Sequence, residues 1–234
     1  MHSYDAVIAS VTPATPSIHV LQLKITDPGF RFLPGQWVDL SIALDGITHQ
    51  AGYSVTTSPV HQGSIELAIK ASSHHPVARW AHEQAAVGDR VRITQGQGPF
   101  VYLPEMSENV VLIGGGVGVT PLLSIFRHVR DARLPTRVHL LYSVSDSREI
   151  LFHPELDAAP HTHPNLHVAI TVTQPDSAWH GLTGRIDPVK LRTLEVPNDT
   201  LYYLCGPKGM VEDMSTLLHD MGVPMSRIIF EKWW

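Results

Sequence analysis

The sequence contains one cysteine, Cys205, which excludes an internal disulfide framework. One thiolate cannot by itself hold a zinc or iron–sulfur centre, so any iron–sulfur centre that serves this protein is expected on a partner. Stretches dense in Lys and Arg are also missing, and the net charge is -5. Both features argue against a nucleic acid as the ligand.

Long apolar runs are absent as well. No stretch approaches the length that crosses a bilayer, so we expect no membrane span. The N-terminus lacks a basic region followed by an apolar block, which is the pattern of a secretory signal. These two absences predict a cytoplasmic protein.

Histidine, by contrast, is abundant, and the sequence has 15 of these residues. The pairs His74/His75 and His161/His163 suggest metal ligands, but no cluster of Cys or carboxylate residues supports them. Solvated loop histidines are the favoured interpretation, and we predict no metal site.

The first hundred residues have the pattern of a small closed sheet. The chain length of 234 residues allows two ordinary domains, and 43% hydrophobic residues with 17% charged residues are typical of a soluble globular protein. Short strands separated by turn residues indicate a barrel rather than βαβ units. The strands are predicted at 4–12, 18–25, 36–42, 48–55, 64–71 and 90–94, with one helix at 76–86.

The second predicted strand has a change of phase. Ile18 and Val20 are followed by Leu21, Leu23 and Ile25, so the apolar positions switch from even to odd numbers. We expect a β-bulge at this switch.

After Pro104 the pattern changes to unbroken apolar runs alternating with helical segments, which is typical of a parallel sheet covered by helices on both faces. Strands are predicted at 110–113, 138–143, 166–172 and 201–204. A helix at 208–221 is expected to turn an apolar stripe toward the core. Its members are Met210, Val211, Met214, Leu217, Leu218 and Met221. We therefore predict an antiparallel six-stranded β-barrel domain over 1–103 and a parallel α/β domain over 108–234.

A glycine-rich turn at 114–121 is the strongest local signal. A buried strand ends in four glycines, and a helix follows, with Thr120 as the expected N-cap and Pro121 as the first helical residue. Glycines let the backbone approach a ligand closely, and free N–H groups at a helix start attract a diphosphate. The ordinary Rossmann fingerprint has a third glycine where this chain has Pro121. It also has an acidic ribose partner about 20 residues later, and no clear one is present here. We therefore interpret the segment as another kind of dinucleotide turn.

Four ordered motifs resemble the ferredoxin–NADP reductase superfamily, and they cover essentially the whole chain. They are 32–36, Tyr53-Ser54 before Ser58-Pro59, the turn at 114–121, and Cys205-Gly206-Pro207 with Met210. Residues 51–54, 75–78 and 230–234 are similar to the branch of oxidoreductase NAD-binding domain-containing proteins. The resemblance implies that the barrel binds flavin and that the α/β domain binds nicotinamide.

The resemblance also implies residue roles. Tyr53 would pack on the flavin ring, and the Ser54 hydroxyl would bond near N5, the hydride acceptor. Cys205 would lie beside the nicotinamide C4. One ring of the terminal pair Trp233-Trp234 would stack on the flavin ring and act as a gate, because the nicotinamide must displace it to reach the flavin. The implied catalytic set is Ser54, Cys205, Glu231 and Trp234. The implied cofactor-binding set is Tyr53, Ser54, Val55, Ala68, Ile69, Lys70, His75, Pro76, Val77, Ala78, Gly115, Gly116, Val117, Gly118, Thr120, Pro121, Ser143, Arg148, Arg185, Cys205, Gly206, Pro207, Met210, Trp233 and Trp234.

Two departures bear on the flavin. The family's phosphate-binding arginine is replaced by Ala51, and a glycine-rich anchor is replaced by residues 74–78. Losing a bidentate arginine weakens a phosphate site. The sequence favours FAD, with FMN or a diffusible flavin as alternatives. Ser145 and Gln174 stand where NADP-specific relatives have arginines, which favours NADH over NADPH.

These features predict an FAD-linked NAD(P)H oxidoreductase that passes electrons to a small-molecule or protein acceptor. One alternative is an NAD(P)H:flavin reductase that uses flavin as a substrate. A second is a nicotinamide-binding sensor without turnover. The sequence indicates no particular oligomeric state.

Overall fold

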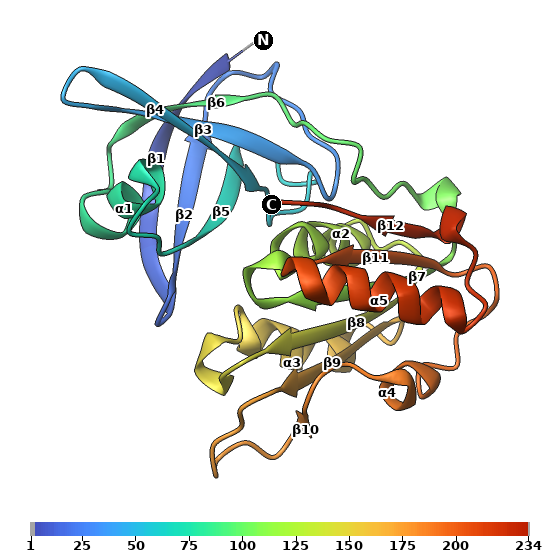
Figure 1. Cartoon of the computed structure of the whole chain (residues 1–234). Helices are drawn as coiled ribbons and strands as arrows, with labels where there is room; N and C mark the ends of the chain where they lie inside the picture. Colours follow the sequence, from blue (N-terminus) through green and yellow to red (C-terminus); the bar gives the residue numbers. More distant parts are fainter. Residues whose placement is uncertain (1–2, 234) are drawn as a thin grey trace.

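The computed structural model describes residues 3–233 and contains two six-stranded sheets, one in each half of the chain (Figure 1). The first sheet is antiparallel, with the spatial order β4-β3-β6-β1-β2-β5. A bridge between Val55 and Leu67 joins its two edges and closes the barrel. The strands are β1 (Ser3–Thr15), β2 (Ile18–Ile25), β3 (Trp37–Leu44), β4 (Ile47–Ser54), β5 (Ser64–Lys70) and β6 (Arg90–Thr94). The predicted antiparallel six-stranded barrel is confirmed, and its one helix is α1 (Pro76–Glu83).

The bulge predicted in β2 is wrong. β2 pairs residue for residue with β5 from Ile18 to Lys24. The register shifts lie in β1 instead, between Ile8 and Ser10 and again further along that strand. The switch of phase has another cause, because β2 is buried on both faces. Its odd-numbered residues pack in the barrel, whereas Ile18 and Val20 pack against the second half of the chain.

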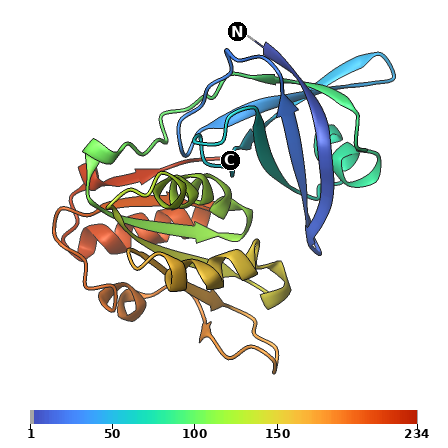
Figure 2. The same ribbon diagram turned by 180° about the vertical axis from the view of Figure 1, so that it is seen from behind.

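The second sheet is parallel, as predicted, with the spatial order β10-β9-β8-β7-β11-β12. Its strands are β7 (Asn109–Gly115), β8 (Arg137–Val144), β9 (Leu166–Val172), β10 (Leu182–Thr183), β11 (Leu201–Cys205) and β12 (Ile228–Phe230). One face packs against α2 (Val119–Asp131) and α3 (His153–Thr162), and the other against α4 (Pro188–Arg192) and α5 (Lys208–Asp220) (Figure 2). Short 3-10 turns are η1 (Pro104–Met106), η2 (Gly116–Gly118), η3 (Ser147–Glu149) and η4 (Met225–Arg227).

Helix α5 buries a shorter stripe than predicted. Val211, Met214 and Leu218 are buried, while Met210 and Leu217 are partly buried against the same core. Met221 lies beyond the helix and is 36% exposed. The stripe therefore ends one turn before the predicted end.

The predicted N-cap of α2 is also wrong. The glycines at 116–118 form a 3-10 turn that runs directly into the helix, which begins at Val119. Thr120 is inside the first turn, and its hydroxyl donates to the Val117 carbonyl at 2.9 Å. Pro121 is tolerated at the third position because the first N–H groups of a helix have no intrahelical partner.

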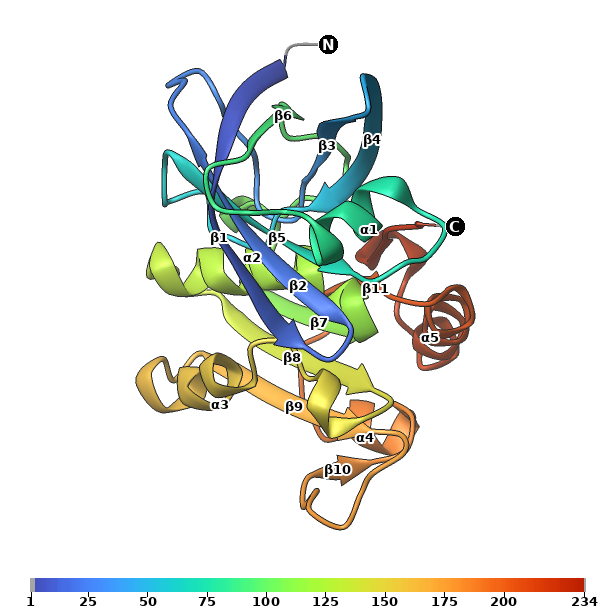
Figure 3. The ribbon, with the colours of Figure 1, turned by 90° about the vertical axis from the view of Figure 1, so that its left-hand side faces the viewer.

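The two halves are joined by apolar packing and by specific hydrogen bonds. The tip of the β1–β2 hairpin reaches the second half of the chain near β8 (Figure 3). There, Thr15 and Ser17 donate to the Glu149 carboxylate at 2.8 and 2.7 Å. The Tyr203 hydroxyl of β11 donates to the Val101 carbonyl at 2.8 Å. Within residues 3–233, no helix has both the length and the apolar character that crossing a membrane requires.

Candidate functional site: a cleft between barrel and α/β domain

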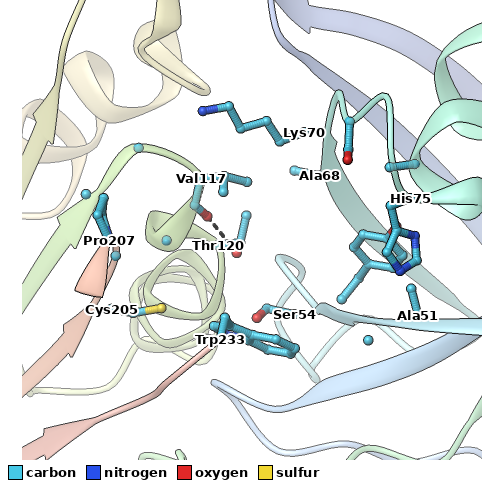
Figure 4. Close-up of a pocket in the computed structure, with 18 of the residues that line it drawn as sticks. Ala51, Ser54, Ala68, Lys70, His75, Val117, Thr120, Cys205, Pro207 and Trp233 are labelled. Atoms are coloured by element: carbon cyan, nitrogen blue, oxygen red, sulfur yellow. Dashed lines mark hydrogen bonds between the residues drawn. The ribbon is translucent and has the colours of Figure 1, made fainter. Parts of the chain in front are cut away.

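A cavity of about 690 Å³ lies between the two halves, and both halves contribute to its walls (Figure 4). This volume is within the usual range for small-molecule and cofactor sites. The barrel contributes Ala51, Gly52, Tyr53, Ser54, Ala68, Lys70, Ser72, His75, Ala78. The α/β half contributes Gly115, Gly116, Val117, Gly118, Thr120, Cys205, Gly206, Pro207, Lys208 and Trp233.

The end of β4 forms one wall of the cavity. Ser54 is only 5% exposed, and its hydroxyl group lies at the cavity beside Trp233 (Figure 4). Burial raises the pKa of Tyr53 to about 12, so its phenol stays protonated at neutral pH. This wall therefore presents one aromatic face and one small hydroxyl group.

The charges around the cavity favour an anionic ligand. Among its described lining residues, the charged side chains are two lysines, Lys70 and Lys208, and no carboxylate is present. Lys70 extends over the cavity from β5 (Figure 4). The start of α1 lies on the same wall, and the His75 side chain makes no capping hydrogen bond there. The N–H groups of the first turn are therefore available to a phosphate.

The glycine turn forms the opposite wall. At Gly118, an added Cβ would meet the Gly206 backbone at 2.5 Å, so this glycine lets the turn pack against the end of β11. At Gly116, φ is +54°, and an added Cβ would meet nothing within 4 Å. Gly118 is thus required by packing, whereas Gly116 leaves open space at the cavity and has a left-handed backbone that favours glycine.

Cys205 ends β11 and faces the cavity from the side opposite Ser54 (Figure 4). It is 1% exposed. Burial, with a smaller contribution from the Glu231 carboxylate, raises the pKa of the Cys205 thiol well above its ordinary value. A thiol that stays protonated is a poor nucleophile. Its contribution to the site is therefore its shape and polarisability.

Trp233 links the chain end to the barrel. Its indole N–H donates to Glu231 Oε2 at 3.1 Å, and its ring packs edge-on to Trp37 of β3, with ring centroids 5.7 Å apart. Trp233 is 46% exposed and lines the cavity. Burial raises the pKa of Glu231 to about 7, and the bond from Trp233 acts in the opposite direction. The charge of this carboxyl group therefore changes near neutral pH.

Family models match both halves of the chain. An oxidoreductase FAD-binding domain matches residues 7–102, and an oxidoreductase NAD-binding domain matches residues 112–216. The oxidoreductase NAD-binding domain-containing protein 1 of Danio rerio is 34% identical over 255 residues, which cover 100% of this chain and 93% of that protein. The chain belongs to the family of oxidoreductase NAD-binding domain-containing proteins, with an FAD-binding and an NAD-binding domain.

Two further proteins are similar over nearly the whole chain. The toluate 1,2-dioxygenase electron transfer component of Pseudomonas putida is 28% identical over 98% of this chain and 67% of its own. The structure of a ferredoxin NADP+ reductase from Neisseria gonorrhoeae, with bound FAD and NADP, matches with a TM-score of 0.84. It covers 100% of both chains at 22% identity, which supports the fold alone.

Several residues implied by the superfamily resemblance lie away from the cavity wall. Val55, Ile69 and Val77 have side chains in the barrel core. Met210 lies behind the glycine turn, where an added Cβ at Gly115 would meet its sulfur. Pro76 begins α1, and Pro121 is buried in α2. Ser143, Arg148 and Arg185 are not in the cavity wall, and Trp234 lies outside the described residues.

Arg148 is already paired. In η3 its guanidinium binds both oxygens of Asp146, with Nη2 to Oδ2 at 2.5 Å and Nε to Oδ1 at 3.1 Å. The side-chain and backbone hydrogen bonds from Arg148 lower the pKa of Asp146 to about 2. Arg148 is the one arginine of the segment 143–149 that could bind a 2'-phosphate, and it already has a carboxylate partner.

Four cavity residues, Ala51, Gly52, Ser72 and Lys208, are absent from the set predicted from the sequence. Ala51 was considered only as the replacement of a phosphate-binding arginine. Gly52 carries a usable signal, because a glycine inside a strand often marks a close approach. An added Cβ there would meet the rings of Trp233 and Trp37 at 3.1 and 3.2 Å. Ser72 and Lys208 are ordinary polar residues in the sequence, so only the fold places them here.

Proposed function

We propose that this chain is an FAD-linked NAD(P)H oxidoreductase whose two ligands meet in the cavity between its halves. One observation carries the proposal: Ser54 of the barrel and Cys205 of the α/β half face the same cavity, beside a glycine turn and two lysines. In this proposal residues 1–103 hold the flavin, and residues 108–234 bind the nicotinamide nucleotide.

The residues present fit a flavin nucleotide. Tyr53 offers a ring surface, Ser54 offers a hydroxyl group, and Lys70 with the first turn of α1 offers positive charge for a diphosphate. When bound, the flavin accepts a hydride from the reduced nicotinamide and transfers electrons onward. The protein's contribution is to place the two ligands in reacting geometry and to exclude water.

The acceptor is proposed to be a small molecule or a protein. The Pseudomonas relative is named as the electron transfer component of a dioxygenase, which supports a protein acceptor. The described residues contain no group of three or more His, Cys, Asp or Glu side chains that could hold a metal ion. Within this proposal, any metal centre of the electron-transfer path would lie on the partner protein.

We further propose that NADH is preferred over NADPH. The segment at 145–149 follows β8, which is the neighbour of β7, so it lies at the same sheet edge as the glycine turn. Ligands bind at this edge in open α/β sheets. Asp146 neutralises Arg148 there and would repel a 2'-phosphate.

Replacing Asp146 by Asn is expected to raise kcat/KM for NADPH by about two- to fivefold, because it frees an exposed arginine whose ion pairs are individually weak. Asn retains the capping ability that Asp146 has in η3. Steady-state kinetics with both nucleotides measure the change. The double variant Asp146→Asn/Arg148→Leu should lose the gain. A gain that persists in the double variant would show that Arg148 does not contact the phosphate.

Replacing Trp233 by Ala is expected to tighten NAD+ binding by about threefold or more, because the bound state no longer requires displacement of a ring from the cavity. Isothermal titration of the flavin-loaded protein measures this affinity. Deletion of Trp234, the gate that the resemblance implies, is the companion variant and should act in the same direction. The gate proposal fails if both variants bind NAD+ as the wild type does.

The flavin reductase alternative is favoured by one observation, the presence of Ala51 in the cavity, at the position where the resemblance implies a phosphate-binding arginine. The absorption spectrum of the purified protein separates the two proposals. Stoichiometric flavin that is bleached by anaerobic NADH supports the bound-cofactor enzyme. A colourless protein that oxidises NADH only when flavin is added supports the flavin reductase. A protein that neither binds flavin nor oxidises NADH with added flavin would refute both.

A further inference from the structure

One arginine of α2 is buried where the two halves of the chain meet. Arg127 is 7% exposed. Its Nη1 donates to Glu66 Oε1 at 2.7 Å and to the Thr56 carbonyl at 3.1 Å, both in the barrel. Its Nε and Nη2 donate to the two oxygens of Glu155 at 2.8 and 2.5 Å, in the α/β half. A single guanidinium therefore connects both halves through several bonds.

The surroundings of Arg127 keep it charged. Burial disfavours the charge, but the ion pairs with Glu155 and Glu66 outweigh it and raise the pKa of Arg127. The Phe152 ring covers the guanidinium, with its centroid 4.3 Å from Cζ. The pairing with Glu155 is bidentate, which fixes direction as well as distance. A lysine, with a single point of charge, has no equivalent geometry.

Both ends of this connection lead to the cavity. On the barrel side, Thr56 follows Ser54 by two residues, and its N–H and hydroxyl groups bond to Glu66 at 3.0 and 2.6 Å. On the other side, α2 begins at the glycine turn, and Arg127 is two helical turns after Thr120. Ser124, between them, donates to the Thr57 carbonyl at 2.8 Å.

We propose that Arg127 is a positioning residue that sets the separation between the Ser54 wall and the glycine-turn wall of the cavity. This inference rests on the proposed function, since the separation determines how the flavin and nicotinamide rings meet. Arg127 does not line the cavity, so it acts on the reaction only through Glu66, Thr56 and α2. Transfer between two bound rings depends steeply on their placement, and a displacement of about 1 Å can cost roughly 100-fold in rate.

The test compares Arg127→Met with Arg130→Met. Arg130 lies on the same helix and binds the same Glu155 carboxylate at 2.5 Å, but its own bonds go to Glu155 and Asp131 in the α/β half. It reaches the barrel only indirectly, through the exposed contact of Asp131 with His61 at 2.9 Å. For Arg127→Met we expect flavin and NADH affinities within about threefold of wild type and a stopped-flow hydride-transfer rate lowered by about 10- to 100-fold. Arg130→Met should transfer hydride at the wild-type rate.

Hydrogen exchange of the ligand-free protein gives a readout without turnover. The amide of Thr56, which bonds to the Glu66 carbonyl, should exchange faster in Arg127→Met than in Arg130→Met. Arg127→Met leaves the Glu66 carboxylate without its ion-pair partner, and an unpaired buried charge can prevent folding. If that variant does not fold, the double variant Arg127→Met/Glu66→Gln, which removes this charge, is measured instead.

The outcomes separate the inference from the proposed function. Wild-type hydride transfer in the Arg127 variants, or equal loss in Arg130→Met, would overturn the positioning role. A wild-type protein that binds no flavin and oxidises no NADH would overturn the proposed function. In that case, unchanged exchange at Thr56 would also overturn the role of Arg127 as a link between the halves, whereas faster exchange would support that structural role alone.

Discussion

Gly116→Val is expected to weaken NADH binding by about 10- to 100-fold, the effect of losing one or two charge-assisted hydrogen bonds to a diphosphate. Gly116 has φ +54° and open space where a Cβ would point, at the wall of the cavity. A valine there would place two methyl groups where the proposed diphosphate approaches the backbone. Titration of the purified variant with NADH measures the affinity.

Gly222→Val is the matched control for backbone strain. Gly222 also has a left-handed backbone, with φ +92°, and an added Cβ there meets nothing within 4 Å. It follows α5 in the same half of the chain and is not in the cavity wall. Both variants should lose about 1–2 kcal/mol of stability in thermal unfolding, the usual cost of this conformation for a branched residue. Only Gly116→Val should lose NADH affinity, and equal affinities in both would show that the diphosphate binds elsewhere.

Ser54→Ala is expected to slow hydride transfer by about 10- to 100-fold while the dissociation constant for NADH changes by less than about twofold. The Ser54 hydroxyl group is proposed to bond to the flavin where charge develops during transfer, so its loss affects the transition state rather than nicotinamide binding. Anaerobic stopped-flow mixing separates the two quantities.

Ser58→Ala is the control for losing a buried hydroxyl group. Ser58 is buried in the same segment, and its Oγ accepts from the Val60 N–H at 3.3 Å, outside the cavity wall. Its hydride-transfer rate should match the wild-type rate. If Ser54→Ala matched it too, Ser54 would have no part in the transfer step.

Alternating and continuous apolar patterns predicted most strands of both sheets, because each face of these strands is either mainly buried or mainly exposed along its length. β5 alternates, and β7 and β11 at the centre of the second sheet are nearly continuous apolar runs, whereas β8 and β9 each include a histidine. The same reasoning failed at β2, since Ile18 and Val20 face a partner half that the local sequence does not show. Elements β10, β12 and α4 were missed because each is only two to five residues long. In α3, two buried residues and an internal proline give too weak a pattern.

Residues of the candidate site could be predicted where they form a short motif of consecutive residues. The glycine turn, the Tyr53-Ser54 pair and Cys205-Gly206-Pro207 all line the cavity. Contacts between distant residues were not predictable. The bond from Arg127 to Glu66 spans 61 positions, and the packing of Trp233 on Trp37 joins the C-terminal end of the chain to β3 of the barrel. The pairing of Arg148 with Asp146 is local, but its bidentate geometry depends on the turn of η3.

The most direct test of the central claim is a crystal structure of the protein with flavin and NAD+ bound together. The account predicts that the flavin ring lies against Tyr53 with N5 within hydrogen-bond reach of Ser54. It also predicts that the nicotinamide ring lies between the flavin and Cys205, with the diphosphate on the glycine turn. Either ring bound outside the cavity between the two halves would contradict the account.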